Sequence, residues 1–288
     1  MHKEAFPIRL HEARLMMGYS MDKLAEETGG IITKQSISRY EKGIMRPKRD
    51  ALEALAKALN ISGEYFEGTN LKIDIPMLRT TSDGKLSEDE LQAIEAKLSF
   101  WAEQYLAKEK EAGFPTQFKN PIKGRKVSTL EDAIRAANLL REKWHCGDGP
   151  IASILRLLER KGIMILSASL PDNVFGMSTW ADKKHPLIIL DFNPEKSSVE
   201  KLRFTALHEL AHLLLQFPEE SQFKLEKRCD FFACFFLLPK QAFIEELGSN
   251  KREKITLEEM IDIKELYGQS LAASIIAARD YDIITTEY

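Results

Sequence analysis

The sequence lacks an apolar run approaching the roughly 18 residues that a membrane span requires. Its first four residues, MHKE, contain no apolar core of a signal peptide. Cysteine is scarce as well, because only Cys146, Cys229 and Cys234 occur and none belongs to a CxxC pair. We therefore expect reduced thiols in a cytoplasmic protein that has no membrane partner.

An excess of charge of one sign is also missing. The chain holds 41 Lys and Arg against 44 Asp and Glu, a net charge of -3, so composition alone does not predict a nucleic-acid partner. Residues 1–66 nevertheless carry a net charge of +2, from 11 basic and 9 acidic residues. This asymmetry favours an N-terminal DNA-binding segment, and the length of 288 residues predicts roughly two domains.

The N-terminal third has the pattern of a compact bundle of short helices. We predict these helices at residues 9–17, 20–27, 33–42 and 49–59. Ser20 and Thr33 provide N-caps for the second and the third. Residues 68–85 have the composition of a linker. A long charged helix over residues 86–111 is predicted next, as a spacer or a dimer contact, and residues 113–127 form a second, solvated linker.

The remaining sequence mixes strands and helices. Helices are predicted at residues 130–143, 151–161, 199–216, 219–238, 257–267 and 270–281, and strands at 162–167, 174–180 and 186–192. The expected fold class is therefore α+β. The expected domains are residues 1–68, a linker with its long helix at 69–127, and residues 128–288.

His208 and His212 lie four residues apart on a predicted helix, so both imidazoles share one face and can bind one ion. Zinc binds imidazole nitrogen, and a catalytic zinc site has three protein ligands and an open position for water. Glu209 follows the first histidine and can act as the general base on that water. The HExxH motif therefore predicts zinc as the cofactor of a peptidase.

The third ligand is expected from the following helix, where Glu226 and Asp230 have ExxxD spacing. Glu226 would bind the metal, and Asp230 would orient the first histidine from outside the ligand set. Glu219 and Glu220 are alternative ligands, although both lie close to the end of the preceding helix. A solvated acidic face is the alternative interpretation, which the apolar character of this helix disfavours.

These motifs resemble the ImmA/IrrE family of metallopeptidases over residues 128–245. The matching segments are RFTALHELAHLLL at 203–215, the acids at 226 and 230, FA at 232–233, LLP at 237–239 and GMS at 176–178. The resemblance implies a zincin-like fold and cleavage of a regulatory protein, typically a DNA-bound repressor. Cys229 replaces an alanine that is usual in the family, and Gln216 replaces a common histidine.

Two further features border this region. His185 precedes the predicted strand at 186–192, and we interpret it as a histidine of a surface loop. The strand itself has two open interpretations. It could be a sheet edge that pairs with an extended peptide substrate, or it could be a strand of the core.

The N-terminal bundle predicts a DNA-reading helix. Thr33, Lys34, Gln35, Ser36 and Arg39 cap it or face outward and can donate hydrogen bonds to bases and phosphates. Together with ISRYEKG at 37–43, the bundle resembles the XRE/Cro-type helix-turn-helix family. The turn at residues 30–32 is about two residues longer than usual, which leaves open whether Lys34 or Gln35 reads bases. A bundle for protein contact is the alternative.

The sequence therefore predicts a DNA-binding regulator with a zinc-dependent endopeptidase domain. Its expected partners are a double-stranded DNA operator, a protein substrate such as a repressor, and a second copy of the chain. The alternative is a non-proteolytic, zinc-containing repressor or the antitoxin of a toxin. An intact Glu209 favours the enzyme, because a structural zinc site needs no base. A third hypothesis is a peptidase domain that senses a small ligand or peptide.

Overall fold

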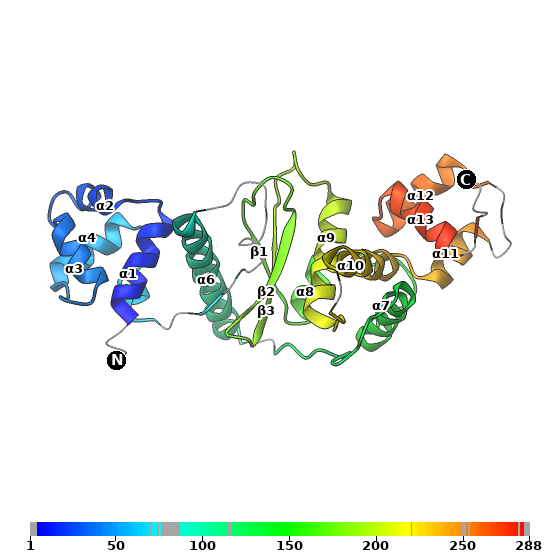
Figure 1. Cartoon of the computed structure of the whole chain (residues 1–288), viewed down its shortest axis with the longest axis horizontal. Helices are drawn as coiled ribbons and strands as arrows, with labels where there is room; N and C mark the ends of the chain where they lie inside the picture. The colour runs from blue at the N-terminus through cyan, green and yellow to red at the C-terminus, as the bar shows by residue number, and fades with distance from the viewer. Residues whose placement is uncertain are drawn as a thin grey trace. The chain divides into compact units, whose positions relative to one another are not determined.

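The computed structural model describes residues 5–68, 71–73, 75, 87–113, 117–219, 221–248, 252, 254–281 and 283–284. The chain divides into two compact units (Figure 1). Unit 1 comprises Met1–Pro115 and Trp180–Lys184, and unit 2 comprises Thr116–Thr179 and His185–Tyr288. Within the described ranges, no helix is both long and apolar enough to cross a membrane.

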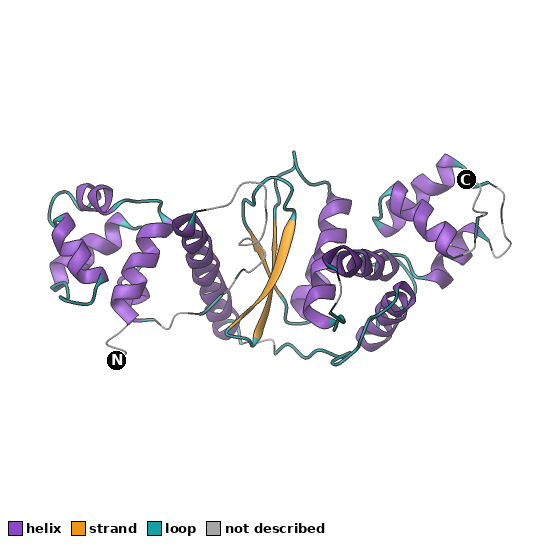
Figure 2. Cartoon of the chain, in the orientation of Figure 1, coloured by secondary structure: helices purple, strands orange, loops and turns teal. Residues whose placement is uncertain are grey.

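The described N-terminal segment of unit 1 is helical (Figure 2), whereas Trp180–Lys184 is the end of a strand and a turn. Its elements are α1 (Ala5–Met16), α2 (Met21–Glu27), α3 (Lys34–Glu41), α4 (Arg49–Ala58), the 3-10 helix η1 (Gly63–Glu67) and α6 (Glu88–Glu111). The predicted caps are present, since Ser20 and Thr33 each accept a backbone N–H of the first turn of α2 and α3. Leu10, Leu24 and Ile37 are fully buried. Apolar burial of this kind, from several helices at once, is what holds short helices together.

The lengthened turn between α2 and α3 has a clear physical basis. Gly29 and Gly30 have φ angles of 68° and 76°, a left-handed backbone that glycine adopts without steric cost. The hydroxyl of Thr28 donates to the carbonyl of Ala25 at 2.7 Å and accepts the N–H of Ile32 at 3.3 Å. Ile32 is 3% exposed, so the additional residues end on a side chain buried in the core.

Helix α6 packs against the bundle rather than standing alone as a spacer. It contacts α1, and its residues Leu91, Leu98 and Ala102 are buried. The guanidinium of Arg9 bonds Glu103 of α6 at 2.8 Å and lies 4.4 Å from the ring centre of Tyr65. This packing was not predicted, because the sequence of a charged amphipathic helix does not indicate which element it packs against.

The described elements after α6 are a small sheet and seven helices (Figure 2), of which α8 and α9 contact the sheet. They are α7 (Leu130–Trp144), α8 (Ile154–Arg160), β1 (Met164–Ser167), β2 (Gly176–Ala181), β3 (His185–Leu190), α9 (Val199–Leu214), α10 (Gln222–Leu237), α11 (Lys240–Leu247), α12 (Leu257–Tyr267) and α13 (Leu271–Asp280). The fold class is therefore α+β, as predicted. Helix α11 was not predicted, because Pro239 indicates only the end of the preceding helix. In the structure Pro239 is also the N-cap residue of α11.

The sheet has the strand order β1-β3-β2, and β1 pairs in parallel with β3 from Met164↔Leu187 to Ser167↔Leu190. Strand β3 is thus the middle strand of this sheet and is buried from its second residue onward. The core interpretation of this segment is correct and the edge interpretation is wrong. His185 is half-buried at the start of β3, so its placement in a surface loop was also wrong.

Close packing joins the sheet to the helix that carries the HExxH motif. A Cβ at Gly176 would lie 2.5 Å from the Cγ2 atom of Thr205, so only glycine allows β2 to approach α9 this closely. Helix α10 is held against α7, where the ring of Phe236 meets that of Trp144 edge-on at a centroid distance of 6.1 Å. The buried guanidinium of Arg141 donates to the carbonyl oxygen of Phe236 at 2.6 Å. These contacts fix the α9 and α10 backbones that carry the candidate site.

Candidate metal centre and DNA-binding helix

Helix α9 presents two histidines on one face. It starts at the N-cap Ser198, and its apolar residues Leu207, Leu210 and Ala211 are fully buried. This packing fixes the rotation of the helix about its axis and leaves His208 and His212, one turn apart, partly accessible. Their Nε2 atoms are 3.1 Å apart.

The carboxylate of Glu226, on α10, completes a cluster of three donor atoms. Its Oε2 atom lies 2.9 Å from Nε2 of His208 and 3.5 Å from Nε2 of His212. Its Oε1 atom accepts a hydrogen bond from the side-chain amide of Gln222. The structure thus brings together the three side chains that the sequence singled out as metal ligands.

The cluster fits a zinc ion in donor type and in spacing. Donors held tetrahedrally at 2.0–2.2 Å from zinc would lie about 3.3–3.6 Å from one another. The observed separations of 2.9, 3.1 and 3.5 Å differ from these values by a few tenths of an ångström. Two imidazoles and one carboxylate are also a donor set that a catalytic zinc site uses, with the fourth position left open.

Asp230 lies on the other side of the His208 ring, with its Oδ1 atom 2.8 Å from Nδ1. Burial opposes protonation of His208, but the bonds to Asp230 and Glu226 outweigh it and raise the pKa of His208 to about 10. Burial acts against the charge of Glu226 too, and its histidine partners nevertheless hold its pKa well below the usual range. The carboxylates of Glu226 and Asp230 therefore favour a positive charge between them.

Glu209 points to the sheet rather than to α10. It is 4% exposed, and the hydroxyl of Ser178, on β2, donates to its Oε2 atom at 2.7 Å. The GMS segment at 176–178 belongs to the family resemblance, but its sequence predicted no role for Ser178. The signal was weak, because a serine 31 residues before a glutamate becomes its neighbour only through the pairing of sheet and helix.

In unit 1, helix α3 exposes part of its predicted DNA-contact set. Lys34, Gln35 and Arg39 are exposed, and the ammonium group of Lys34 pairs with Asp22 at 2.6 Å. Thr33 is exposed too, but its hydroxyl caps the helix by accepting the N–H of half-buried Ser36. Gln35 and Arg39 therefore have the least local competition for bonds to DNA.

Comparison with known families assigns both parts of the chain. Residues 10–66 match the helix-turn-helix family model, and residues 158–275 match the model of the IrrE N-terminal-like domain. No curated protein matches the chain significantly. The chain joins a helix-turn-helix domain to an IrrE N-terminal-like peptidase domain. Both resemblances predicted from the sequence are confirmed. The first domain implies binding to DNA, and the second implies a protein substrate and a bound metal.

Glu219, Glu220 and Cys229 are the other residues in this part of the sequence that could be considered as metal ligands. Glu219 is exposed, while Glu220 lies outside the described residues. Cys229 is fully buried. It lies near both histidines, since one donor atom from each of Cys229, His208 and His212 can be chosen so that all three lie within 4.8 Å of one another. Its Sγ atom approaches His212 at Nδ1, at 3.8 Å, on the side of the ring away from Nε2. Cys229 is therefore a neighbour of the cluster around Nε2, and burial raises the pKa of its thiol.

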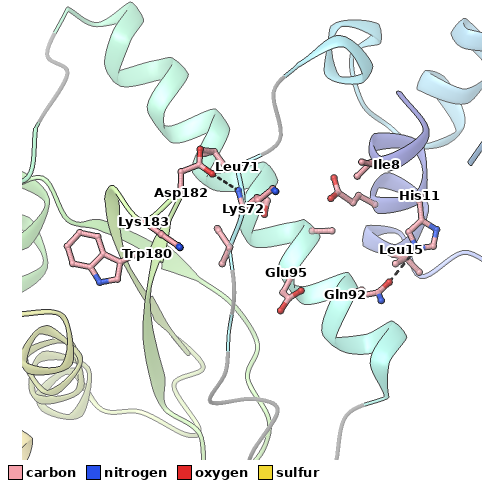
Figure 3. Close-up of a pocket in the computed structure, with 14 residues that line it drawn as sticks. Ile8, His11, Leu15, Leu71, Lys72, Gln92, Glu95, Trp180, Asp182 and Lys183 are labelled. Carbon is pink, nitrogen blue, oxygen red and sulfur yellow. Dashed lines mark hydrogen bonds between the residues drawn. The ribbon is translucent and has the colours of Figure 1, made fainter. Parts of the chain in front are cut away.

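A pocket of about 940 Å³ lies in unit 1 (Figure 3). His11 lines it, with Nδ1 3.0 Å from Glu41 of α3 and Nε2 3.4 Å from Gln92 of α6. The bond to Glu41 raises the pKa of His11 above its usual value. The backbone N–H of Lys72 donates to Asp182 at 2.9 Å (Figure 3). Charges of both signs line this pocket, so it favours no single class of ligand.

Proposed function

We propose that the chain is a transcriptional regulator whose IrrE-like domain is a zinc-dependent endopeptidase that cleaves a regulatory protein such as a repressor. The observation that carries the proposal is the convergence of three donor atoms, on His208, His212 and Glu226, within 3.5 Å of one another. A buried carboxylate, Glu209, directly follows the first of them. A structural zinc site would require the donors but not this base.

Each side chain then has a chemical task. His208, His212 and Glu226 would hold the zinc ion, which would supply a Lewis acid able to lower the pKa of water to about 7 and to polarise a carbonyl oxygen. Glu209 would accept a proton from water as general base and return it to the leaving amine as general acid. Ser178 fixes one oxygen of that carboxylate by its hydrogen bond, which leaves the other oxygen for proton transfer. Asp230 would hold His208 with Nε2 toward the metal.

The test compares wild type, Glu209→Gln and the control Glu219→Gln, which alters an exposed glutamate. Each full-length protein, loaded with zinc, is incubated with a cell lysate, and new peptide N-termini are identified by mass spectrometry. We expect the same termini with wild type and the control, and none with Glu209→Gln at unchanged zinc content. Termini that persist with Glu209→Gln would exclude Glu209 as the base. No new termini with zinc-loaded wild type would favour the non-proteolytic repressor or antitoxin.

For the helix-turn-helix domain we propose that α3 reads a palindromic operator as part of a dimer. Full-length protein is titrated against DNA from upstream of its own gene and against random duplex, at two salt concentrations. Gln35→Ala should relax sequence preference by about 1–3 kcal/mol at one base pair. Arg39→Ala and Lys34→Ala should weaken binding to both duplexes and flatten the salt dependence. Lys97→Ala, an exposed change on α6, should do neither. Equal affinity of wild type for both duplexes would support a protein-contact module.

A further inference from the structure

Besides the pocket in unit 1, the structure has a cavity in the IrrE-like domain, and this cavity has no role in the proposed chemistry. It measures about 610 Å³ and lies between α9, α10 and α13. Apolar side chains form most of its surface, among them Phe204, Phe231, Phe235, Ala273 and Ile276. Its size falls within the range of small-molecule sites.

The cavity lies on the Nδ1 side of His208, away from the donor cluster. Asp230 lines it, and the same carboxylate bonds Nδ1 of that histidine at 2.8 Å. The donor cluster meets the ring at Nε2, and neither Glu209, His212 nor Glu226 lines the cavity. A ligand here would touch the side chain that orients a proposed metal ligand without contacting the donor cluster itself.

The charges around the cavity favour an anion. Its two acids already have partners, because Glu200 pairs with Lys264 at 2.7 Å and Oδ1 of Asp230 lies 2.8 Å from Nδ1 of His208. Lys201 and Lys227 also line it, and neither forms an ion pair within the part of the chain that the structure describes. The ammonium group of Lys201 lies over the ring of Phe175 instead.

Two helix ends add to this preference. The N-caps of α9 and α13, Ser198 and Ser270, both line the cavity. The positive ends of the two helix dipoles therefore lie at its wall and favour a negative group.

We propose that this cavity binds an amphipathic anion, namely a carboxylate with an apolar chain, and that its occupancy is coupled to metal binding through Asp230. The apolar wall takes the chain, and Lys201 and Lys227 take the carboxylate. The coupling rests on the proposed metal site, whereas the binding of the anion does not. Coupling is reciprocal, so a ligand that alters zinc affinity is itself bound differently when zinc is present.

Calorimetric titration of the full chain with decanoate, decanol and decylamine tests the binding. We expect one decanoate per chain, with an affinity at least about tenfold above that of decanol, as charge-assisted bonds to lysine imply, and no binding of the amine. Lys201→Met with Lys227→Met should remove the preference for decanoate. Lys108→Met, an exposed change on α6, should leave it intact. Equal affinity for decanol and decanoate would overturn the anionic assignment.

A second pair of variants locates the ligand. Ala273→Trp fills the cavity and should abolish binding of decanoate. Ile276→Trp covers it from a position that is 42% exposed, so it serves if the first variant does not fold. Decanoate that still binds to the folded filled variants would place the ligand elsewhere and overturn the proposal.

Chelator competition measures the coupling. Saturating decanoate should change zinc affinity by about fivefold or more, and Asp230→Ala, which removes the bond to Nδ1 of His208, should remove this effect while decanoate still binds. If decanoate binds but leaves zinc affinity unchanged, the coupling is wrong. That outcome would not bear on the peptidase proposal, which the Glu209→Gln experiment tests independently.

Discussion

Replacing Asp230 by alanine tests how much the metal site depends on a residue that is not itself a ligand. The change removes the acceptor that lies 2.8 Å from Nδ1 of His208 and frees the ring to rotate or change tautomer. Loss of such an orienting carboxylate typically lowers metal affinity by ~10–100-fold. The Asp230 side chain is 51% exposed, and water can take over part of its role. We therefore expect a loss near the lower end of this range at neutral pH.

The loss should grow as the pH rises. In the metal-free site, burial opposes the charge of His208, but Asp230 and Glu226 raise its pKa to about 10, so zinc must displace a proton below that pH. Asp230→Ala removes one cause of the raised pKa and so weakens the competition from protons. This gain offsets part of the lost affinity at pH 7. It fades as the pH approaches 10, because the proton then leaves the wild-type histidine as well.

The assay is competition for zinc with a chromophoric chelator at pH 7 and pH 9. Asp230→Asn is informative beside alanine, because its amide oxygen can still accept the Nδ1–H bond, so its loss should be smaller. Asp262→Ala, an exposed change on α12, is the matched control. Unchanged affinity of Asp230→Ala at both pH values would refute the orienting role, and so would an equal loss in Asp262→Ala.

Three further predictions concern the hydrogen bond from Ser178 to Glu209, the proton of His208, and the ion pair between Glu41 and Arg14. Ser178→Ala removes the donor to Glu209 and should lower kcat/KM on a cleaved peptide by roughly tenfold at unchanged zinc content, since a hydrogen bond to a charged group contributes about 1.5–3 kcal/mol; an equal loss of zinc would contradict this. Wild-type zinc affinity should rise between pH 6 and pH 9, because His208 must lose its proton, and a flat profile would show that it does not. Glu41→Ala leaves the buried Arg14 without its carboxylate partner at 2.6 Å and should lower the free energy of unfolding of the helix-turn-helix domain by ~3–5 kcal/mol. Thermal denaturation measures that change, and a melting temperature equal to wild type would exclude it.

Local features of this protein could be predicted from the sequence. The N-caps at Ser20 and Thr33 depend on side chains and backbone groups three residues apart, so nothing distant decides them. The same holds for the spacing of His208 and His212, which any continuous helix converts into a shared face. Both family resemblances were predictable because their motifs are local and occur in order.

Contacts between distant segments could not be predicted. The bond from Ser178 to Glu209 depends on how closely β2 approaches α9, which in turn depends on Gly176. The packing of α6 on α1 depends on shape and on single contacts such as that of Arg9. The middle position of β3 depends on pairing order, which an apolar run does not encode.

Helix α10 shows how the core and the candidate site are built from one sequence. Its rings at Phe232 and Phe236 stack at 6.1 Å and are fully buried, which fixes the rotation of the helix about its axis. The face that remains toward α9 carries Glu226 and Asp230, one turn apart, and these meet His208 from its two sides. Apolar burial is thus sufficient to place both acids. The IrrE-like domain should therefore keep its fold when zinc is removed, unlike small domains whose core is the metal itself.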